Sequence, residues 1–275
     1  MSADQQRQIR VGMVGGGPGA GIAETHRTAM RLDDRYGLVA GVFSRDREKS
    51  LTAAQRVRIP EDRVYGDYAA MAMVESRRAD GIEVVSILYD LGTHAHQLAR
   101  FVTGLEVTEV AAELSQIVPG RAIKDNADML LRFSNGARGT LWASMAAVGN
   151  EHGSRIRVYG ERGSLGWRRE DPYHLRYCPV DGPPQILAQG AGWLSPDANR
   201  WTRVGLGHPE GFFEAFANLY TEVADALLAK AAGQSYSKPE LGFPDALDGF
   251  RGVAFVEGAM RSYASGGVWS TIETS

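Results

Sequence analysis

Short apolar segments alternate with helix-like segments from residue 9 to residue 88. In the segments between the apolar runs, apolar residues recur at the spacing of one helix face. Strands are predicted at 9–14, 37–43 and 81–88, a short strand and turn at 63–68, and helices at 22–32 and 69–79. This alternation predicts right-handed βαβ units and a parallel sheet, the arrangement of an α/β domain.

A glycine-rich turn joins the first predicted strand to the first predicted helix. The pattern Gly15-x-Gly17-x-x-Ala20 fits a dinucleotide-binding fingerprint with alanine at its third position. Gly15 would permit the tight turn, Gly17 would let the backbone approach a pyrophosphate, and Ala20 would let helix and strand pack closely. Pro18 and Gly19 complete the candidate cofactor-binding loop. The alternative is a glycine-rich turn that binds nothing.

The end of the second predicted strand bears on the choice of coenzyme. An acidic residue there usually binds the ribose hydroxyls of NAD, whereas this chain has Ser44 followed by Arg45. A hydroxyl beside a guanidinium suits a 2′-phosphate better, so the sequence favours NADP over NAD. Alternatively, Ser44 caps the helix that follows.

After residue 104 the pattern changes to candidate strands joined by turns. Residues 107–118 alternate like a strand, and Asn135-Gly136 is a strong hairpin signal between two further candidate strands. The strands predict an open antiparallel sheet, and residues 183–207 predict a long loop. Further strands are predicted at 129–133, 139–146, 155–159, 164–167 and 174–180, and helices at 210–232 and 243–264. The second part is therefore of the α+β class.

Composition narrows the classes of function. The 275 residues carry a formal charge of -3, which gives no support for a partner of nucleic acid or anionic membrane. The single cysteine, Cys178, excludes an internal disulfide and a cysteine-based metal cluster. Because the first ten residues are polar and no apolar run is long enough to cross a bilayer, we expect a cytoplasmic protein without a membrane segment.

Taken together, the segments resemble the glucose–fructose oxidoreductase / inositol dehydrogenase / MocA (Gfo/Idh/MocA) family of NAD(P)-dependent oxidoreductases. The resemblance rests on MVGGGPGAGIAETHRTA, LVAGVFSRD, RVYGDYAAMA, GIEVVSI, LGTHAHQLARFVTG, DNADMLLRFSNGARGTLWAS, RIRVYGERGSLGW and GHPEGFFEAFANLY. It implies a dinucleotide-binding domain at 1–89 and a substrate and oligomerisation domain at 90–275. It also implies NAD or NADP as coenzyme, a sugar or polyol as substrate, and a homodimer or homotetramer formed through the open sheet.

The resemblance also implies site residues. His94 would be the acid/base group, Asp90 would bind or orient the substrate, and His208 would lie near the substrate pocket. On spacing alone, Asp90 as a helix cap and His94 as a packed core histidine are the alternative, and a helix-start turn is the alternative for His208. A metal site is not expected, because His94 and His96 diverge on a helix and no third ligand is apparent.

The chain departs from the family pattern after the fourth predicted strand. Ser86-Ile87 passes directly into the segment of Asp90 and His94, so roughly a hundred residues, about three βα units of a doubly wound sheet, are expected to be missing. The missing part includes the family's Glu-Lys-Pro segment, and none of the four lysines (Lys49, Lys124, Lys230 and Lys238) stands in such a context. Three hypotheses follow: a shortened domain that keeps some activity, a catalytically degenerate paralogue that binds nucleotide or serves as an oligomeric partner, and an incomplete product.

Overall fold

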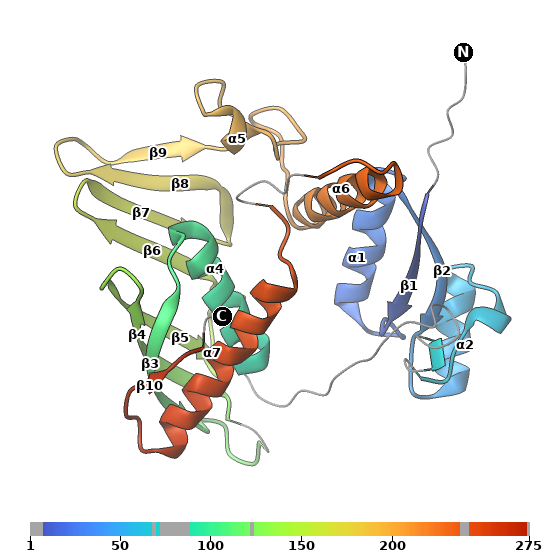
Figure 1. The fold of residues 1–275 in the computed structure, drawn as a ribbon, viewed down its shortest axis with the longest axis horizontal. Helices are drawn as coiled ribbons and strands as arrows, with labels where there is room; N and C mark the ends of the chain where they lie inside the picture. The colour runs from blue at the N-terminus through green and yellow to red at the C-terminus, as the bar shows by residue number, and fades with distance from the viewer. Residues whose placement is uncertain (1–7, 68–69, 72–87, 122–123, 237–241, 274–275) are drawn as a thin grey trace. The chain divides into compact units, whose positions relative to one another are not determined.

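The chain folds into two compact units. The structure, a computed structural model, describes residues 8–67, 70–71, 88–121, 124–236 and 242–273 (Figure 1). The first unit combines Met1–Glu83 with Gly192–Phe243, and the second combines Val84–Ala191 with Pro244–Ser275. This division differs from the predicted boundary at residue 89, which assigned all later residues to one domain.

The first unit contains the predicted parallel sheet. Strands β1 (Ile9–Val14) and β2 (Tyr36–Val42) pair in parallel. Helix α1 (Gly21–Leu32) connects them, and α2 (Arg47–Arg56) follows β2. A short 3-10 helix (Glu61–Arg63) precedes a single parallel bridge from Val64 to Gly41. The α/β prediction is confirmed for this part, whereas the predicted strand at 81–88, except Leu88, and most of the helix at 69–79 lie outside the described residues.

Helix α2 begins and packs for reasons that are local to its sequence. Asp46 caps it, because its carboxylate accepts hydrogen bonds from the backbone N–H groups of Glu48 and Lys49. Its buried face, Ala53 and Ala54, packs with Phe43 at the end of β2 in one apolar cluster. This cluster holds the helix against the sheet beside the glycine-rich turn.

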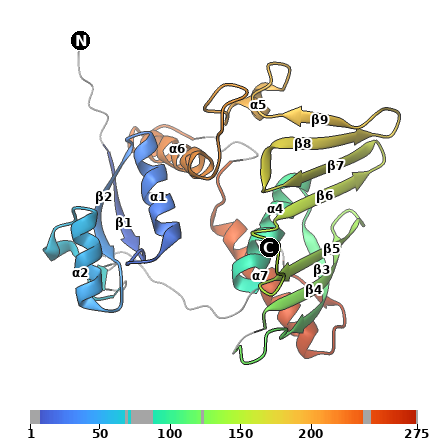
Figure 2. The ribbon, with the colours of Figure 1, turned by 180° about the vertical axis from the view of Figure 1, so that it is seen from behind.

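Helix α6 (Phe212–Ala231) belongs to the first unit, although it is distant in sequence from α1. The two helices lie side by side in Figures 1 and 2. Buried Ala224 of α6 packs with Met30 and Tyr36 in one apolar cluster. Arg203 binds Asp33 at the end of α1 through two hydrogen bonds of 2.7 and 2.8 Å. These contacts explain why residues 192–243 join the first unit and not the second.

The second unit contains two antiparallel sheets, where the sequence predicted one. Strand order is β10-β3-β4-β5 in the first sheet and β6-β7-β8-β9 in the second. The first sheet consists of β3 (Val107–Ser115), β4 (Asn126–Phe133), β5 (Arg138–Ser144) and β10 (Ser270–Thr271). The second consists of β6 (Arg155–Gly160), β7 (Gly163–Arg168), β8 (Asp171–Pro179) and β9 (Gln185–Ala188).

Two of the predicted element boundaries were wrong. The predicted strand at 107–118 ends at Ser115, because the buried Asp125 carboxylate accepts hydrogen bonds from the backbone N–H groups of Ile117 and Val118 and turns the chain. The predicted loop at 183–207 contains β9 and a short helix α5 (Pro196–Asn199), which Ser195 caps. The strand β9 forms a hairpin with β8, and this pairing formed no part of the loop prediction.

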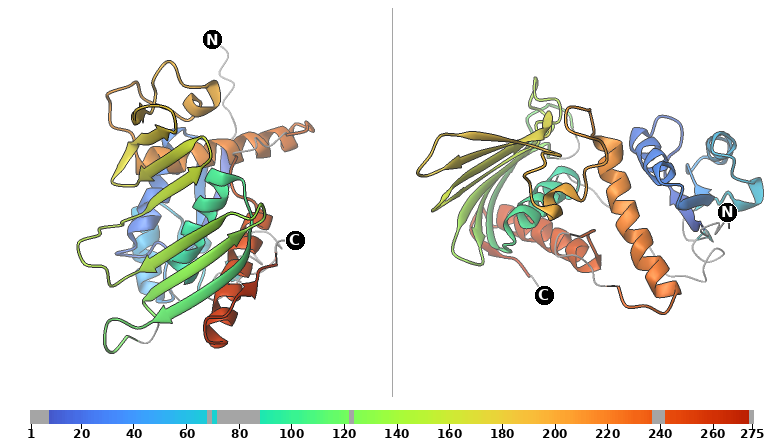
Figure 3. Two further views of the ribbon diagram at one scale, coloured as in Figure 1. Left: turned by 90° about the vertical axis from the view of Figure 1, so that its left-hand side faces the viewer. Right: turned by 90° about the horizontal axis from the view of Figure 1, so that it is seen from above.

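One face of the first antiparallel sheet carries the core of the second unit. Helices α4 (Thr93–Thr103) and α7 (Ala246–Ala264) cover that face, as Figure 3 shows. Alternate residues of β3, such as Val110 and Ala112, are buried there together with Phe255 of α7. The buried Ser262 hydroxyl accepts a hydrogen bond from the Ala112 N–H and so fixes α7 to the strand.

Replacement of Phe255 tests this core. Phe255 is 0% exposed, so Phe255→Ala would lower the free energy of unfolding by about 3–5 kcal/mol through lost burial and a residual cavity. Phe250→Ala on the same helix is the control, because that ring is 43% exposed and its removal would cost much less. Urea denaturation measures both, and equal losses would contradict the assigned core.

Candidate functional site

The glycine-rich turn between β1 and α1 adopts a conformation that its sequence requires. Gly15 and Gly19 have φ angles of 85° and 90°, a left-handed region that favours glycine. The Gly15 N–H donates a 2.7 Å hydrogen bond to the Val42 carbonyl and so ties the turn to the end of β2. Helix α1 starts with Ala20 as N-cap, and no side chain caps its first N–H groups. Such an end is suited to an anion.

Steric contacts explain the glycines at positions 16 and 17. A Cβ atom at Gly17 would lie 2.6 Å from the Phe43 carbonyl oxygen, which is backbone and cannot move away cheaply. A Cβ at Gly16 would lie 2.8 Å from the Cβ of Ala23. The glycine at position 17 therefore lets the turn approach β2, a role that the fingerprint alone did not indicate.

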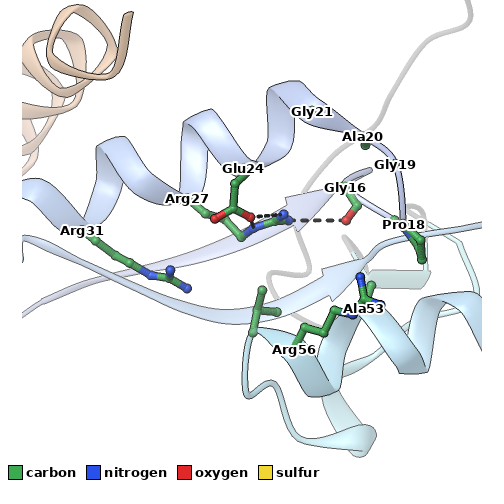
Figure 4. A pocket seen from close by; sticks show the side chains of 12 residues that line it. Gly16, Pro18, Gly19, Ala20, Gly21, Glu24, Arg27, Arg31, Ala53 and Arg56 are labelled. Atoms are coloured by element: carbon green, nitrogen blue, oxygen red, sulfur yellow. Dashed lines mark hydrogen bonds and ion pairs between the residues drawn. The ribbon is translucent and has the colours of Figure 1, made fainter.

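A pocket of about 360 Å³ opens beside this turn (Figure 4). Four of the five residues predicted for the cofactor-binding loop line it, and Gly15 does not. The other walls come from α1 and α2. The full lining consists of Gly16, Gly17, Pro18, Gly19, Ala20, Gly21, Glu24, Arg27, Arg31, Ala53, Arg56 and Val57. Sequence reasoning did not single out the arginines of this lining, because the fingerprint concerns only the glycine-rich turn.

The predicted coenzyme-selecting residues Ser44 and Arg45 do not line this pocket. Ser44 is half-buried, and its hydroxyl accepts a hydrogen bond of 3.1 Å from the Asp46 N–H. Since Asp46 is the N-cap of α2, Ser44 supports the turn before the helix and is not the cap itself. Arg45 is exposed.

In the second unit, Asp90 and His94 lie on consecutive turns of different helix type. Asp90 is in a π-helical turn, Leu88–Gly92, that runs directly into α4, and His94 is the second residue of α4. The side chain of His94 is exposed, so His94 is not a packed core histidine, and that of Asp90 lies outside the described atoms. Single π-turns are found frequently at functional sites. Because a π-turn is wider than an α-turn, the spacing of four does not by itself put both residues on one face.

A buried ionic cluster anchors α4 to the rest of the second unit. Arg100 is only 9% exposed and donates hydrogen bonds of 2.7 and 2.8 Å to the two carboxylate oxygens of Glu106. It also donates a 3.1 Å hydrogen bond to Asp248 at the start of α7. The hydrogen bonds from Arg100 lower the pKa of Glu106. Glu106 is therefore the main partner of Arg100.

His96 lies on the opposite side of α4 from solvent. It is 1% exposed and stacks on Phe255 with ring centroids 4.5 Å apart. Its Nδ1 atom has no hydrogen-bond partner among the residues that the structure describes. Burial, assisted by the nearby charge of Arg100, lowers the pKa of His96 to about 4. His96 is therefore the neutral core histidine of this helix, which leaves His94 as its solvent-facing imidazole.

His208 belongs to the first unit and sits in a turn before α6. Its backbone N–H and its Nδ1 both approach the Gly205 carbonyl at 3.1 Å. The neighbouring Glu210 is buried and accepts hydrogen bonds from the backbone N–H groups of Arg203 and Val204. This geometry favours the alternative that the sequence left open for His208, a helix-start turn.

The described residues contain neither a cluster of metal ligands nor a helix able to cross a membrane. No group of three or more His, Cys, Asp or Glu residues comes together there as a metal would require. None of the helices in the described part of the chain is long and apolar enough to span a bilayer.

Comparison with known proteins places the chain among oxidoreductases. A family model described as the GFO/IDH/MocA C-terminal domain matches residues 63–166. The uncharacterized oxidoreductase YfiI of Bacillus subtilis is 34% identical over 185 residues, which are 66% of this chain and 47% of YfiI. The chain thus spans about half the length of this curated relative.

Solved structures agree over nearly the whole chain. An oxidoreductase from Sinorhizobium meliloti is 32% identical with a TM-score of 0.84, covering 96% of this chain and 99% of that one. An inositol dehydrogenase homolog from Azotobacter vinelandii, complexed with NADH and myo-inositol, is 26% identical with a TM-score of 0.79, covering 96% and 98%.

The pKa of His96 predicts a pH dependence of stability. Well above pH 6.5, the His96 imidazole is neutral in both the folded and the unfolded protein. As pH falls towards 4, the imidazole of the unfolded protein takes up a proton while that of the folded protein stays neutral. The free energy of unfolding would therefore decrease by about 2 kcal/mol between pH 7.5 and pH 5 through this group.

His96→Leu tests this dependence, because leucine cannot titrate. His26, whose pKa is also lowered by burial, acts in the same direction in both proteins, so only their difference reports on His96. Urea midpoints at pH 7.5 and pH 5 provide the measurement. Identical pH dependence in the two proteins would show that His96 is not buried as described.

Proposed function

The chain belongs to the glucose–fructose oxidoreductase / inositol dehydrogenase / MocA family, and from this premise we propose that it binds a nicotinamide coenzyme at the glycine-rich turn and acts as a dehydrogenase. The substrate class is a sugar or polyol, whose hydroxyl or carbonyl carbon exchanges a hydride with the coenzyme. The inositol dehydrogenase homolog with NADH and myo-inositol supports both assignments.

The observation that carries the proposal is the geometry of the glycine-rich turn. Gly17 approaches the Phe43 carbonyl so closely that only glycine fits, and the uncapped start of α1 opens on the pocket. Backbone N–H groups at such a helix start bind phosphate oxygens without a charged side chain. The pocket lies within one compact unit.

The chemistry at the substrate carbon requires a proton transfer in addition to the hydride that the coenzyme supplies or accepts. In this proposal the His94 imidazole moves the hydroxyl proton, and Asp90 binds or orients the substrate. An exposed His94 on a helix that Arg100 fixes to Glu106 and Asp248 supports this role, because a proton-transfer group must be held in one place. His208 remains a proposed substrate contact, supported by its exposure.

The preference for NADP over NAD is part of the proposal. No acidic residue ends β2 at the position where NAD-dependent enzymes bind the ribose diol, and the exposed Arg45 stands next to it. A guanidinium at that position would attract a phosphate group.

The second candidate function is a coenzyme-binding or oligomeric partner protein without turnover. It is favoured by the sequence, which contains no Glu-Lys-Pro segment to assist His94. It is also favoured by the outer face of the first antiparallel sheet, where Leu130 and Trp142 are 53% and 50% exposed. In both candidates we propose that this face pairs with another copy of the chain, as a homodimer or homotetramer.

Gly17→Ala tests coenzyme binding. The added methyl group would collide with the Phe43 carbonyl, so we expect saturable binding of NADH and NADPH to be lost or weakened at least tenfold. Fluorescence titration is the measurement. Gly205→Ala, which lies in the same unit, is the control, because a Cβ atom at that position would have no other atom within 4 Å. Failure of the unmodified chain to bind either coenzyme would refute the proposed function.

His94→Ala tests catalysis. Loss of a positioned acid/base group would reduce the rate of nicotinamide reduction with a panel of polyols by about 10²–10⁴-fold, while coenzyme binding would be unaffected. His152→Ala removes another exposed histidine of the same unit and would leave the rate unchanged. Equal rates for all three proteins would remove the role of His94, and no turnover with normal coenzyme binding would favour the second candidate.

A further inference from the structure

Arg27 connects the strand, the turn and the helix at the proposed coenzyme site. It belongs to α1, and its guanidinium group donates a 3.4 Å hydrogen bond to the Gly16 carbonyl of the glycine-rich turn. The same group lies 3.7 Å from the Met13 sulfur of β1. It also donates hydrogen bonds of 3.2 and 2.7 Å to one carboxylate oxygen of Glu24, in the first turn of α1 (Figure 4). One side chain therefore contacts all three parts of the site.

This arginine is held in place, unlike the other two arginines of the pocket. Its side chain is 11% exposed, whereas Arg31 and Arg56 are exposed to solvent. A Cβ atom at Gly16 would lie only 2.9 Å from Nη1 of Arg27, so the guanidinium group packs directly against the turn. A nearly buried side chain with several hydrogen bonds has few alternative conformations. Arg27 therefore fixes the position of the turn relative to α1.

The hydrogen bonds of Arg27 also control the charge beside the turn. Among the described residues that line the pocket, Glu24 is the only one with a carboxylate. The hydrogen bonds from Arg27 lower the pKa of Glu24, so this carboxylate is ionised at neutral pH. At the start of a helix such a charge repels an anionic ligand and competes with it for the positive end of the helix dipole. The guanidinium group of Arg27, 2.7 Å away, compensates this charge.

We infer that Arg27 is a positioning residue for the coenzyme, because it holds the Gly16 carbonyl and neutralises Glu24 where the diphosphate would bind. This inference rests on the proposed function. The diphosphate is common to NADH and NADPH, so Arg27 acts on both coenzymes alike, and the choice between them stays with the proposed role of Arg45. Arg27 acts through the turn and through Glu24 and does not need to touch the coenzyme.

The experiment compares the full-length chain with Arg27→Gln, Glu24→Gln and the double variant that carries both changes. Lys230→Gln is the control, because it removes one positive charge from an exposed position on α6 of the same unit that does not line the pocket. Fluorescence titration measures the affinity for NADH and for NADPH. Thermal unfolding without ligand measures the stability of each variant.

Arg27→Gln is expected to weaken the binding of both coenzymes by about tenfold, because Glu24 is then an uncompensated negative charge and the Gly16 carbonyl loses its donor. The double variant regains part of this affinity, since its pocket lining no longer carries the negative charge. Glu24→Gln alone binds both coenzymes more tightly than the unmodified chain. Arg27→Lys keeps the positive charge and therefore binds both coenzymes more tightly than Arg27→Gln.

The recovery in the double variant separates positioning from a purely structural role. A negative charge stabilises the start of a helix, so Glu24→Gln would not repair a loss of stability caused by Arg27→Gln. The inference is overturned if Arg27→Gln binds both coenzymes like Lys230→Gln, or if Glu24→Gln recovers none of the lost affinity. In either case the unmodified chain still binds coenzyme and the proposed function stands. An unmodified chain that binds neither coenzyme refutes both.

Discussion

The first unit depends on the return of α6 to α1 and β2. A pair of strands with two helices has too little apolar surface to be stable alone, so the described strands need further cover. Helix α6 supplies it through buried Ala224 and through polar contacts that fix its position. Tyr36 donates its hydroxyl hydrogen to the Tyr220 carbonyl, and burial raises the pKa of Tyr36 to about 12, so this donor stays protonated. The ion pair of Arg203 with Asp33 lies at the same contact between α1 and residues 192–243.

This contact of α6 with α1 also fixes the helix that follows the glycine-rich turn. Helix α6 packs against α1, and the glycine-rich turn connects the end of β1 to the first turn of α1. The turn itself is fixed against β2 by the Gly15–Val42 hydrogen bond and by the contact of Gly17 with the Phe43 carbonyl. The proposed coenzyme site is built almost entirely from backbone N–H groups, so any specificity for one coenzyme would have to come from nearby side chains.

In the second unit, the helix α4 that carries the exposed His94 is anchored to the core of that unit. This core lies between the β3–β5 strands and α7, and α4 is joined to that core by Phe255 and Arg100. A buried arginine is costly to desolvate, and here two carboxylates and Gln97 offset the cost. On this helix His96 is buried with a lowered pKa, and His94 is exposed. The proposed function needs its proton-transfer group held in one place, which this anchoring of α4 would provide.

Much of this organisation follows from local sequence. Period-two and helical patterns predict the parallel strands, the hairpin at Asn135-Gly136 and the two long helices, because each pattern reflects which side of an element is buried. The glycine spacing predicts the turn, since positive φ angles and close backbone contacts leave few other residues possible. These features depend on interactions within a few residues of one another.

Only the tertiary structure decided which elements share a unit and which charges meet. The assignment of 192–243 to the first unit requires contacts between residues far apart in sequence, such as Arg203 with Asp33, which are 170 positions apart. The same holds for the ion pair of Arg100 with Asp248, which are 148 positions apart. A charged side chain carries no periodic signal that names its partner, because a long flexible side chain can reach solvent from almost any position. Its role is therefore fixed only when packing excludes the water around it.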